Sequence, residues 1–192
     1  MTTVFFDVDT QMDFLFPAGA LYVPGAERLL PVLARLNAYA ANHGIPVVST
    51  IDAHAENDAE FRLWPPHCIQ GALGQRKPDA TLLDGRVLIP NRPAAVPAGA
   101  PQYVVEKQAL DAFTNVNLRA LAAALAADRY AVYGVVTEYC VRCAVLGLLE
   151  TGSRVEVITD AIETLHSEDS RRTLAELSGR GVQMTTAAAI GA

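Results

Sequence analysis

Short apolar runs rich in β-branched residues alternate with longer stretches of helical periodicity through most of this chain. Six runs are expected to form strands, at residues 3–8, 45–51, 103–106, 130–136, 155–159 and 182–185. Helical patterns occupy residues 26–43 and the stretches that begin near Asn115, near Glu138 and at Ser167. Strands and helices that alternate in this way form βαβ units, so the sequence predicts an α/β fold around a parallel sheet.

Length and composition restrict the domain organisation and the partner. The 192 residues suit one domain, expected to span residues 1–192. A formal net charge of −6 without a Lys/Arg cluster argues against a nucleic-acid partner. Three cysteines are an odd number and are expected to be free thiols in a reducing cytoplasm. With no apolar run of membrane-spanning length and no signal-peptide pattern, we expect a cytoplasmic protein with a small-molecule partner and no membrane partner; homo-oligomer formation stays open.

Residues 53–100 interrupt the alternation of strands and helices. This segment is rich in proline and glycine and contains Trp64, His67 and Cys68. A connection of this length within a compact domain is usually either functional or disordered. The aromatic and ligand-type side chains favour a functional segment.

Chemically useful side chains follow four of the predicted strands. Asp9 follows the first strand, Asp52 and His54 follow the second, Lys107 follows the third, and Cys140 lies just after the fourth. In open parallel α/β sheets, ligands bind in the crevice beyond the carboxyl ends of the strands. These residues are therefore expected to meet at one edge of the sheet.

Two further carboxylates lie close to Asp9 in the sequence. Asp7 and Asp13 are interpreted as residues that cap turns, since carboxylates at the end of a strand often do so. Asp7 and Asp9 are two residues apart, so the alternation of a strand predicts that both side chains point to the same side of it.

Cys140 lies where a strand turns into a helix. If Thr137 is the N-cap, the thiol is in the first helical turn, where the helix dipole favours a thiolate. The free N–H groups of that turn are suited to receiving the oxyanion of an acyl-transfer intermediate. Two other interpretations stay open: Cys140 as a small buried hydrophobic residue, and Cys140 with Cys143 as a dithiol redox pair.

A second group of residues has the composition of a metal site. Asp52, His54, Glu60 and His67 are ligand types for Zn, Mn or Fe, and they leave room for water or a substrate. Each of them alone is more often a solvated polar residue or a cap. Their grouping close to Trp64 favours the metal interpretation.

Three common motifs are absent. The first strand is not followed by Gly-x-Gly-x-x-Gly, which argues against a dinucleotide-binding fold of the usual type. There is also no Gly-x-x-x-x-Gly-Lys-Ser/Thr phosphate loop and no Gly-x-Ser-x-Gly nucleophile elbow. A P-loop enzyme and a serine α/β-hydrolase are therefore excluded.

The chain resembles the isochorismatase-like cysteine hydrolases, and within them the nicotinamidase/pyrazinamidase branch. The resemblance covers nearly the whole length and depends on four ordered motifs, at residues 8–21, 52–54 with 64–68, 106–107 and 134–141. The motif at 52–68 is the one that points to nicotinamidases. The sequence departs from the family pattern at Glu60, where many relatives have a third histidine and some have glutamate. Asp7 and Thr10 replace common apolar residues, and Ala53 replaces a frequent aromatic residue.

The resemblance implies an open, six-stranded parallel sheet with helices on both faces, a Rossmann-like arrangement of three layers. It also implies a role for each site residue: a catalytic triad, an oxyanion hole formed by backbone N–H groups, a ring pocket and a ligand set for one divalent metal ion. The triad would consist of Asp9, Lys107 and Cys140, and the oxyanion hole of the N–H groups of Val136 and Cys140. Phe14 and Trp64 would line the ring pocket. The metal ligands would be Asp52, His54, Glu60 and His67. A cis peptide bond between Val135 and Val136 is also expected.

The activity implied by the resemblance is cleavage of a small primary amide, nicotinamide, to nicotinate and ammonia through a thioester, within NAD metabolism. Two alternatives stay open. One is a related metal-independent amidohydrolase that acts on a maleamate- or carbamoyl-type amide. The other is a dithiol redox or binding protein on the same scaffold.

Overall fold

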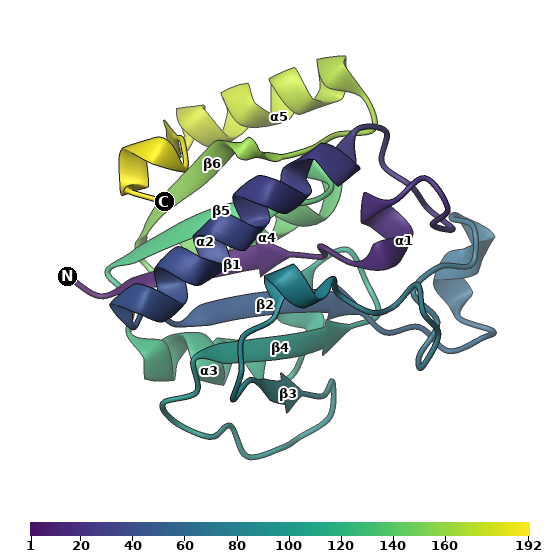
Figure 1. The fold of residues 1–192 in the computed structure, drawn as a ribbon, viewed down its shortest axis with the longest axis horizontal. Coiled ribbons are helices and arrows are strands. Elements are labelled where there is room, and N and C mark those ends of the chain that lie inside the picture. The colour runs from purple at the N-terminus through teal and green to yellow at the C-terminus, as the bar shows by residue number, and fades with distance from the viewer.

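Seven parallel strands form one open sheet, in the order β3-β4-β2-β1-β5-β6-β7 (Figure 1). The structure is a computed structural model that describes residues 1–192. The strands are β1 (Thr3–Val8), β2 (Val47–Asp52), β3 (Val87–Ile89), β4 (Gln102–Lys107), β5 (Arg129–Gly134), β6 (Arg154–Ile162) and β7 (Gln183–Thr185). The central position of β1 places its carboxyl end between those of β2 and β5, which lie on its two sides.

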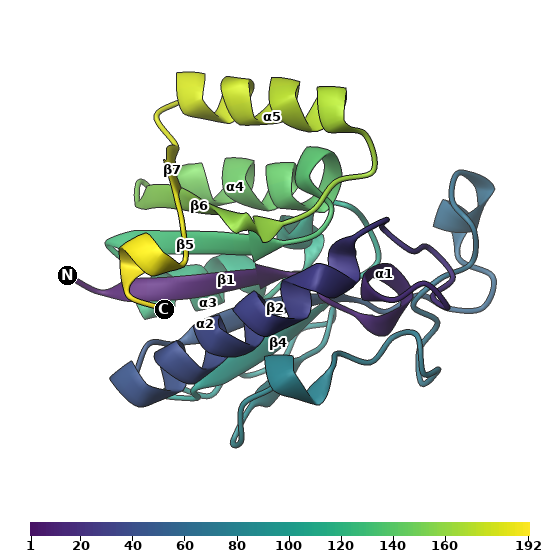
Figure 2. The same ribbon diagram turned by 45° about the horizontal axis from the view of Figure 1, so that its top comes forward.

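Helices cover both faces of the sheet. They are α1 (Met12–Leu15), α2 (Leu30–His43), α3 (Leu118–Leu125), α4 (Arg142–Leu149) and α5 (Ser167–Gly179). α2 lies on one face, and α3 and α4 lie on the other (Figures 1 and 2). None of the helices combines the length and the apolar character that are needed to cross a membrane.

Strand alternation divides the hydrophobic core into two parts. Phe5 of β1 and Val47 of β2 pack with residues of α1 and α2, and we call this side of the sheet the α2 face. Phe6 and Val48 pack on the other side with residues of α3, α4 and α5, and we call this side the α4 face. Successive residues of the inner strands therefore point to opposite faces and are buried on both, as expected for a parallel sheet covered by helices.

The sheet has seven strands, whereas six were expected. The additional strand, β3, lies inside the long segment 53–100 and pairs with β4 at the edge of the sheet. β3 has only three residues, and its central Leu88 is 54% exposed. Such a short edge strand has neither the length nor the buried pattern that reveals a strand in a sequence.

Two of the expected helices are divided in the structure. The pattern over 26–43 begins with a 3₁₀ turn, η1 (Ala26–Leu29), and α2 follows it with Pro31 in its first turn, where proline removes no helical hydrogen bond. The helix expected near Glu138 begins with a π-helical turn, η5 (Thr137–Val141), and continues as α4. π turns are frequent at functional sites.

Candidate active site

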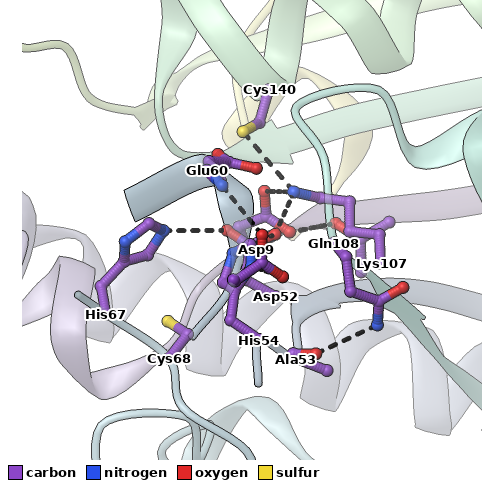
Figure 3. Close-up of polar contacts among 12 residues, drawn as sticks. Asp9, Asp52, Ala53, His54, Glu60, His67, Cys68, Lys107, Gln108 and Cys140 are labelled. Atoms are coloured by element: carbon purple, nitrogen blue, oxygen red, sulfur yellow. Dashed lines mark hydrogen bonds and ion pairs between the residues drawn. The ribbon is translucent and has the colours of Figure 1, made fainter. Parts of the chain in front are cut away.

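Lys107 contacts two carboxylates that come from two other strands. The parallel register of β2 and β4 pairs Asp52 with Lys107, and both side chains lie on the α4 face. Nζ of Lys107 is 2.5 Å from Oδ1 of Asp52 and 2.9 Å from Oδ2 of Asp9 (Figure 3). All three side chains are buried. The ammonium group therefore compensates two carboxylates whose burial without a partner would be strongly unfavourable.

Asp9 reaches Lys107 because the backbone turns at the end of β1. Oγ of Ser49 donates a 3.0 Å hydrogen bond to Asp7, whereas Oγ1 of Thr50 donates a 2.6 Å hydrogen bond to Asp9. Ser49 and Thr50 are consecutive in β2, so Asp7 and Asp9 point to opposite faces. The expectation that they share one side is therefore wrong. The φ of Asp9 is 49°, a left-handed conformation uncommon for residues other than glycine, and it ends the alternation.

Cys140 lies in the π-helical turn η5 that joins β5 to α4. The N–H of Val141 donates to the carbonyl of Val136, five residues earlier, at 3.1 Å. Sγ of Cys140 lies 3.7 Å from Nζ of Lys107, and the side chain is buried. Cys140, Cys143 and Cys68 are all free thiols. The wide turn thus places the sulfur of Cys140 next to the Lys107 and Asp9 pair.

The backbone before Cys140 carries a free hydrogen-bond donor. The peptide bond between Val135 and Val136 is cis, as the family resemblance implies. The N–H of Val135 donates to the carbonyl of Val8, but the N–H of Val136 has no hydrogen-bond partner in the protein. Val136 and Cys140 line the same pocket. The N–H of Val136 is therefore available to an oxygen atom bound beside Cys140.

Burial controls the protonation of the three groups. Burial raises the pKa of the Cys140 thiol well above its usual value, and the nearby Lys107 offsets this only in part. Burial also raises the pKa of Asp9, against the opposite effect of Lys107. For Lys107, burial lowers the pKa, but Asp52 and Asp9 outweigh it and hold the pKa well above its usual range. Desolvation thus favours the neutral thiol of Cys140, in the direction opposite to the thiolate expected from its place near a helix N-terminus.

Asp52, His54 and His67 form a buried cluster at the end of β2. One ligand atom of each lies within 4.8 Å of the others. Nε2 of His54 and Nε2 of His67 are 3.9 and 3.7 Å from carboxylate oxygens of Asp52, too far for hydrogen bonds. These separations are those of ligands that share a cation at about 2.0–2.2 Å from each.

The hydrogen bonds of the two imidazoles support the same interpretation. Nδ1 of His67 contacts the carbonyl of Pro65 at 2.8 Å, which directs Nε2 toward Asp52. Neither ring nitrogen of the fully buried His54 makes a hydrogen bond, although Nδ1 lies 3.1 Å from Oδ2 of Asp58. Buried polar atoms without a partner are rare in folded proteins. The three residues therefore fit a divalent cation, and His54 is the residue that most requires one.

Glu60 is the only expected metal ligand outside this cluster. It belongs to a 3₁₀ turn, η2 (Ala59–Arg62), whose N-cap Asp58 accepts a 2.9 Å hydrogen bond from the Glu60 N–H. Its side chain is half-buried, lines the same pocket as His67 and Asp52, and has a pKa raised by burial. Figure 3 shows Glu60 between this cluster and Cys140. The structure thus places Glu60 beside the candidate metal position but does not join it to the other ligands.

A mostly apolar pocket connects Cys140 with the Asp52, His54 and His67 cluster. Eight of its eleven lining residues are hydrophobic, and Phe14 and Trp64 are among them. The rings of Trp64 and Tyr139 contact each other edge to face, with centroids 5.2 Å apart. No lysine or arginine lines the pocket. The polar part of the lining is limited to Asp52, Glu60 and His67.

Three residues support the site although the sequence did not single them out. Thr50 binds Asp9, and its place two residues before Asp52 in the same strand was an available signal. The side chain of Gln11 accepts from the Asp52 N–H at 2.7 Å and donates to the Asp52 carbonyl at 2.9 Å. Asp58 lies next to His54, as described above. Gln11 and Asp58 lie in irregular segments, where no periodicity indicates what a side chain faces.

Comparison with known proteins gives the family. The model of the isochorismatase domain matches residues 3–189. Nicotinamidase from Escherichia coli K12 is 28% identical, and the alignment covers 94% of this chain and 93% of that protein. Maleamate amidohydrolase from Pseudomonas putida is 26% identical, with 90% and 78% covered.

A solved structure supports the same assignment. The pyrazinamidase of Pyrococcus horikoshii in complex with zinc superposes with a TM-score of 0.80 at 28% identity, over 97% of this chain and 99% of that one. Its sequence and fold agree with the family match along nearly the whole chain. This protein therefore belongs to the isochorismatase-like hydrolase family.

Proposed function

We propose that this enzyme hydrolyses the amide of nicotinamide to give nicotinate and ammonia, with Cys140 as the nucleophile. The observation that carries the proposal is that Cys140, with Lys107 and Asp9 close to it, lines the same pocket as Asp52 and His67 of the candidate metal cluster. The nucleophile needs a base, because burial favours the protonated thiol. Asp9 is the carboxylate beside it.

In the first half of the reaction, Oδ2 of Asp9 accepts the proton of the Cys140 thiol. Apart from the ion pair with Lys107 at 2.9 Å, this oxygen has no hydrogen-bond partner in the protein, which leaves it a lone pair for the proton. The sulfur bonds to the amide carbon, and the N–H groups of Val136 and Cys140 donate to the oxyanion. Asp9 returns the proton to the amide nitrogen, the C–N bond breaks, and ammonia leaves a thioester on Cys140.

In the second half, Asp9 accepts a proton from a water molecule whose oxygen attacks the thioester carbon. The C–S bond breaks, the sulfur takes the proton from Asp9, and the carboxylic acid product is released. Lys107 keeps its proton throughout, since its pKa is raised well above the usual range. Its role is to hold the Asp9 carboxylate in place and to offset the charge of the thiolate.

Asp52, His54 and His67 would hold one divalent cation, Zn, Mn or Fe, and Glu60 is the candidate for a further ligand. Held there, such a cation would supply a Lewis-acid position suited to the pyridine nitrogen of the substrate. Zinc in the pyrazinamidase from Pyrococcus horikoshii supports this assignment.

The pocket favours nicotinamide over maleamate. Maleamate carries a carboxylate, and a buried carboxylate needs a cationic partner. No lysine or arginine lines the pocket, and the nearby Lys107 already contacts two carboxylates, so the cationic partner of that carboxylate would have to be the divalent ion at Asp52, His54 and His67, the position proposed for the pyridine nitrogen. Trp64 and Phe14 instead offer aromatic surface to a ring. The 26% identity to maleamate amidohydrolase supports the alternative that the substrate is a maleamate-type amide.

Ammonia release from nicotinamide, pyrazinamide, maleamate and a carbamoyl compound tests the proposal, together with elemental analysis of the protein. We expect the highest kcat/KM for nicotinamide or pyrazinamide. Cys140→Ala should abolish turnover, and the matched Cys143→Ala should retain it. Turnover by Cys140→Ala would refute the proposed nucleophile. A preference for maleamate by metal-free protein would favour the rival amidase, and loss of function in Cys143→Ala would favour a dithiol pair.

A further inference from the structure

A second buried charge cluster lies on the opposite side of β1 from Cys140, and the proposed reaction does not use it. Its centre is Lys77, which belongs to the segment between β2 and β4. Nζ of Lys77 lies 2.8 Å from Oδ2 of Asp7 and donates to Oγ1 of Thr10 at 2.5 Å. Oγ1 of Thr10 in turn donates to Oδ1 of Asp7 at 2.8 Å. The side chains of Lys77 and Asp7 are only 2% and 1% exposed.

The cluster is fully connected on the α2 face. Oγ of Ser49 donates to Asp7 at 3.0 Å, and Nε2 of Gln102 donates to Ser49 at 2.8 Å. Hydrophobic residues of similar volume often stabilise a protein as well as a buried ion pair does. Stability alone therefore does not explain why the chain has the charged pair Asp7 and Lys77 here.

The position of the cluster in the sequence suggests its role. Asp7 and Thr10 flank Asp9, and Lys77 contacts both of them. Asp9 itself has the left-handed φ of 49° that sends its carboxylate to the α4 face, toward Lys107 and away from Asp7. An extended residue at this place would continue the alternation and point its side chain to the α2 face.

We propose that Lys77 is a positioning residue for Asp9: it fixes Asp7 and Thr10 on the α2 face and thereby holds the intervening backbone in the conformation that presents the Asp9 carboxylate to Cys140. The inference rests on the proposed function, since it takes Asp9 as the proton carrier. Lys77 touches neither the pocket beside Cys140 nor the candidate metal ligands. Its effect on turnover is therefore exerted through Asp9.

Lys77→Met removes the charge and keeps an unbranched side chain of similar length. We expect kcat to fall by about tenfold to a hundredfold, the effect of displacing a catalytic group by about 1 Å, with a much smaller change in KM. Arg76→Met is the matched control, because Arg76 is the neighbouring cation, is exposed and forms no ion pair. Its kcat should equal that of the wild type.

A second measurement does not depend on turnover. The Asp9 carboxylate raises the pKa of Cys140, so its displacement should move the alkylation of Cys140 by iodoacetamide to lower pH. Lys77→Met and Asp9→Asn should shift this profile in the same direction. If the wild type hydrolyses no amide but both variants show the shift, the proposed function fails and the positioning role stands.

The double variant Asp7→Val with Lys77→Met separates positioning from stability. It removes both buried charges, so we expect Tm to return toward the wild-type value while kcat and the alkylation profile remain those of Lys77→Met. It also carries the test if Lys77→Met alone does not fold. A folded Lys77→Met with unchanged kcat and alkylation profile would overturn the inference. A double variant that regains kcat together with Tm would also overturn it.

Discussion

Lys107 lies directly opposite Asp52 in the pairing of β4 with β2, and its ammonium group also contacts Asp9 at 2.9 Å. One cation therefore links the cluster of candidate metal ligands to the proposed proton carrier. Lys107 at the end of β4 pairs with Asp52 at the end of β2, so the register of the two strands is enough to bring the lysine to the candidate metal ligands. No flexible loop is needed for this contact.

Replacement of Asp9 by asparagine keeps the shape of the side chain and removes its capacity to carry a proton. We expect kcat to fall by about 10²–10⁴-fold, the usual contribution of a general acid and base. Asp84→Asn, on an exposed loop, is the control and should leave kcat unchanged. Steady-state ammonia release measures both. Metal content should be unaffected by Asp9→Asn, and turnover at the wild-type rate would show that another group carries the proton.

The reactivity of Cys140 should depend on pH in a direction set by its neighbours. Burial and Asp9 raise the thiol pKa, so alkylation of the wild type should be slow at neutral pH and increase as the pH rises. Asp9→Asn removes a nearby negative charge, which lowers the thiol pKa and moves the profile to lower pH.

Mass spectrometry of the alkylated peptides, in a Cys143→Ala background, provides the measurement. Cys68 is an internal control, because burial raises its pKa far above the usual value and its side chain is inaccessible. An unchanged profile in Asp9→Asn would place the carboxylate outside the electrostatic reach of the sulfur.

The candidate ligands should differ in how strongly they affect metal content. His67→Gln and His54→Gln each remove a nitrogen of the buried cluster, so the purified proteins should lose most of their bound metal in elemental analysis. Glu60→Gln should retain it, because Glu60 lies outside the group formed by Asp52 and the two histidines. Equal loss of metal in Glu60→Gln would show that the glutamate moves into the coordination sphere when the ion binds.

The single tryptophan of the chain offers a direct probe of the pocket. Trp64 lines it and packs edge to face against Tyr139, so binding of nicotinate should change the intrinsic fluorescence. Trp64→Ala should raise KM by up to about tenfold, which corresponds to the 0.5–1.5 kcal/mol of an aromatic contact. Leu63→Ala is the control, since Leu63 is the adjacent residue and is 83% exposed. A fluorescence signal that is insensitive to nicotinate would argue against binding next to Trp64.

Gly134 should be intolerant of any side chain. Its φ is +117°, and a Cβ atom there would lie 2.1 Å from the carbonyl oxygen of Val8. Gly134→Ala should therefore lower the free energy of unfolding by more than about 1 kcal/mol. Gly179→Ala, near the end of α5 with no atom within 4 Å of the added Cβ, should be neutral or stabilising. Chemical denaturation of both variants measures the difference, and equal stabilities would contradict the close approach of β5 to β1.

Much of this arrangement followed from the sequence because parallel strands bring their carboxyl ends to one edge. That rule alone predicted that Asp52, Lys107 and Cys140 would be neighbours, and it required no knowledge of side-chain packing. The periodic elements were found for the same reason, with boundaries that differ by a few residues. The α/β fold and the family resemblance are confirmed, whereas the roles of the individual site residues remain predictions.

The features that escaped sequence analysis have no periodic signal. The direction of Asp9 depends on one φ angle, and strict alternation gave the wrong face. The pairing of Lys77 with Asp7 joins residues far apart in the chain, one of them in an irregular segment. The π turn around Cys140 differs from an α-helical turn by a single hydrogen-bond shift, which residue types do not specify.

The origin of the site residues has a consequence for how new specificities arise on this scaffold. Asp9, Lys107 and Cys140 lie at the ends of the sheet's inner strands, whereas Glu60, Trp64 and the histidine at position 67 all lie in the one stretch of chain after β2. Part of the ligand-binding surface is thus encoded apart from the bond-breaking residues, although Phe14 and Asp52 also line the pocket from outside that stretch. Exchange of that single stretch between homologues offers a route to retarget the enzyme without redesign of its reactive centre.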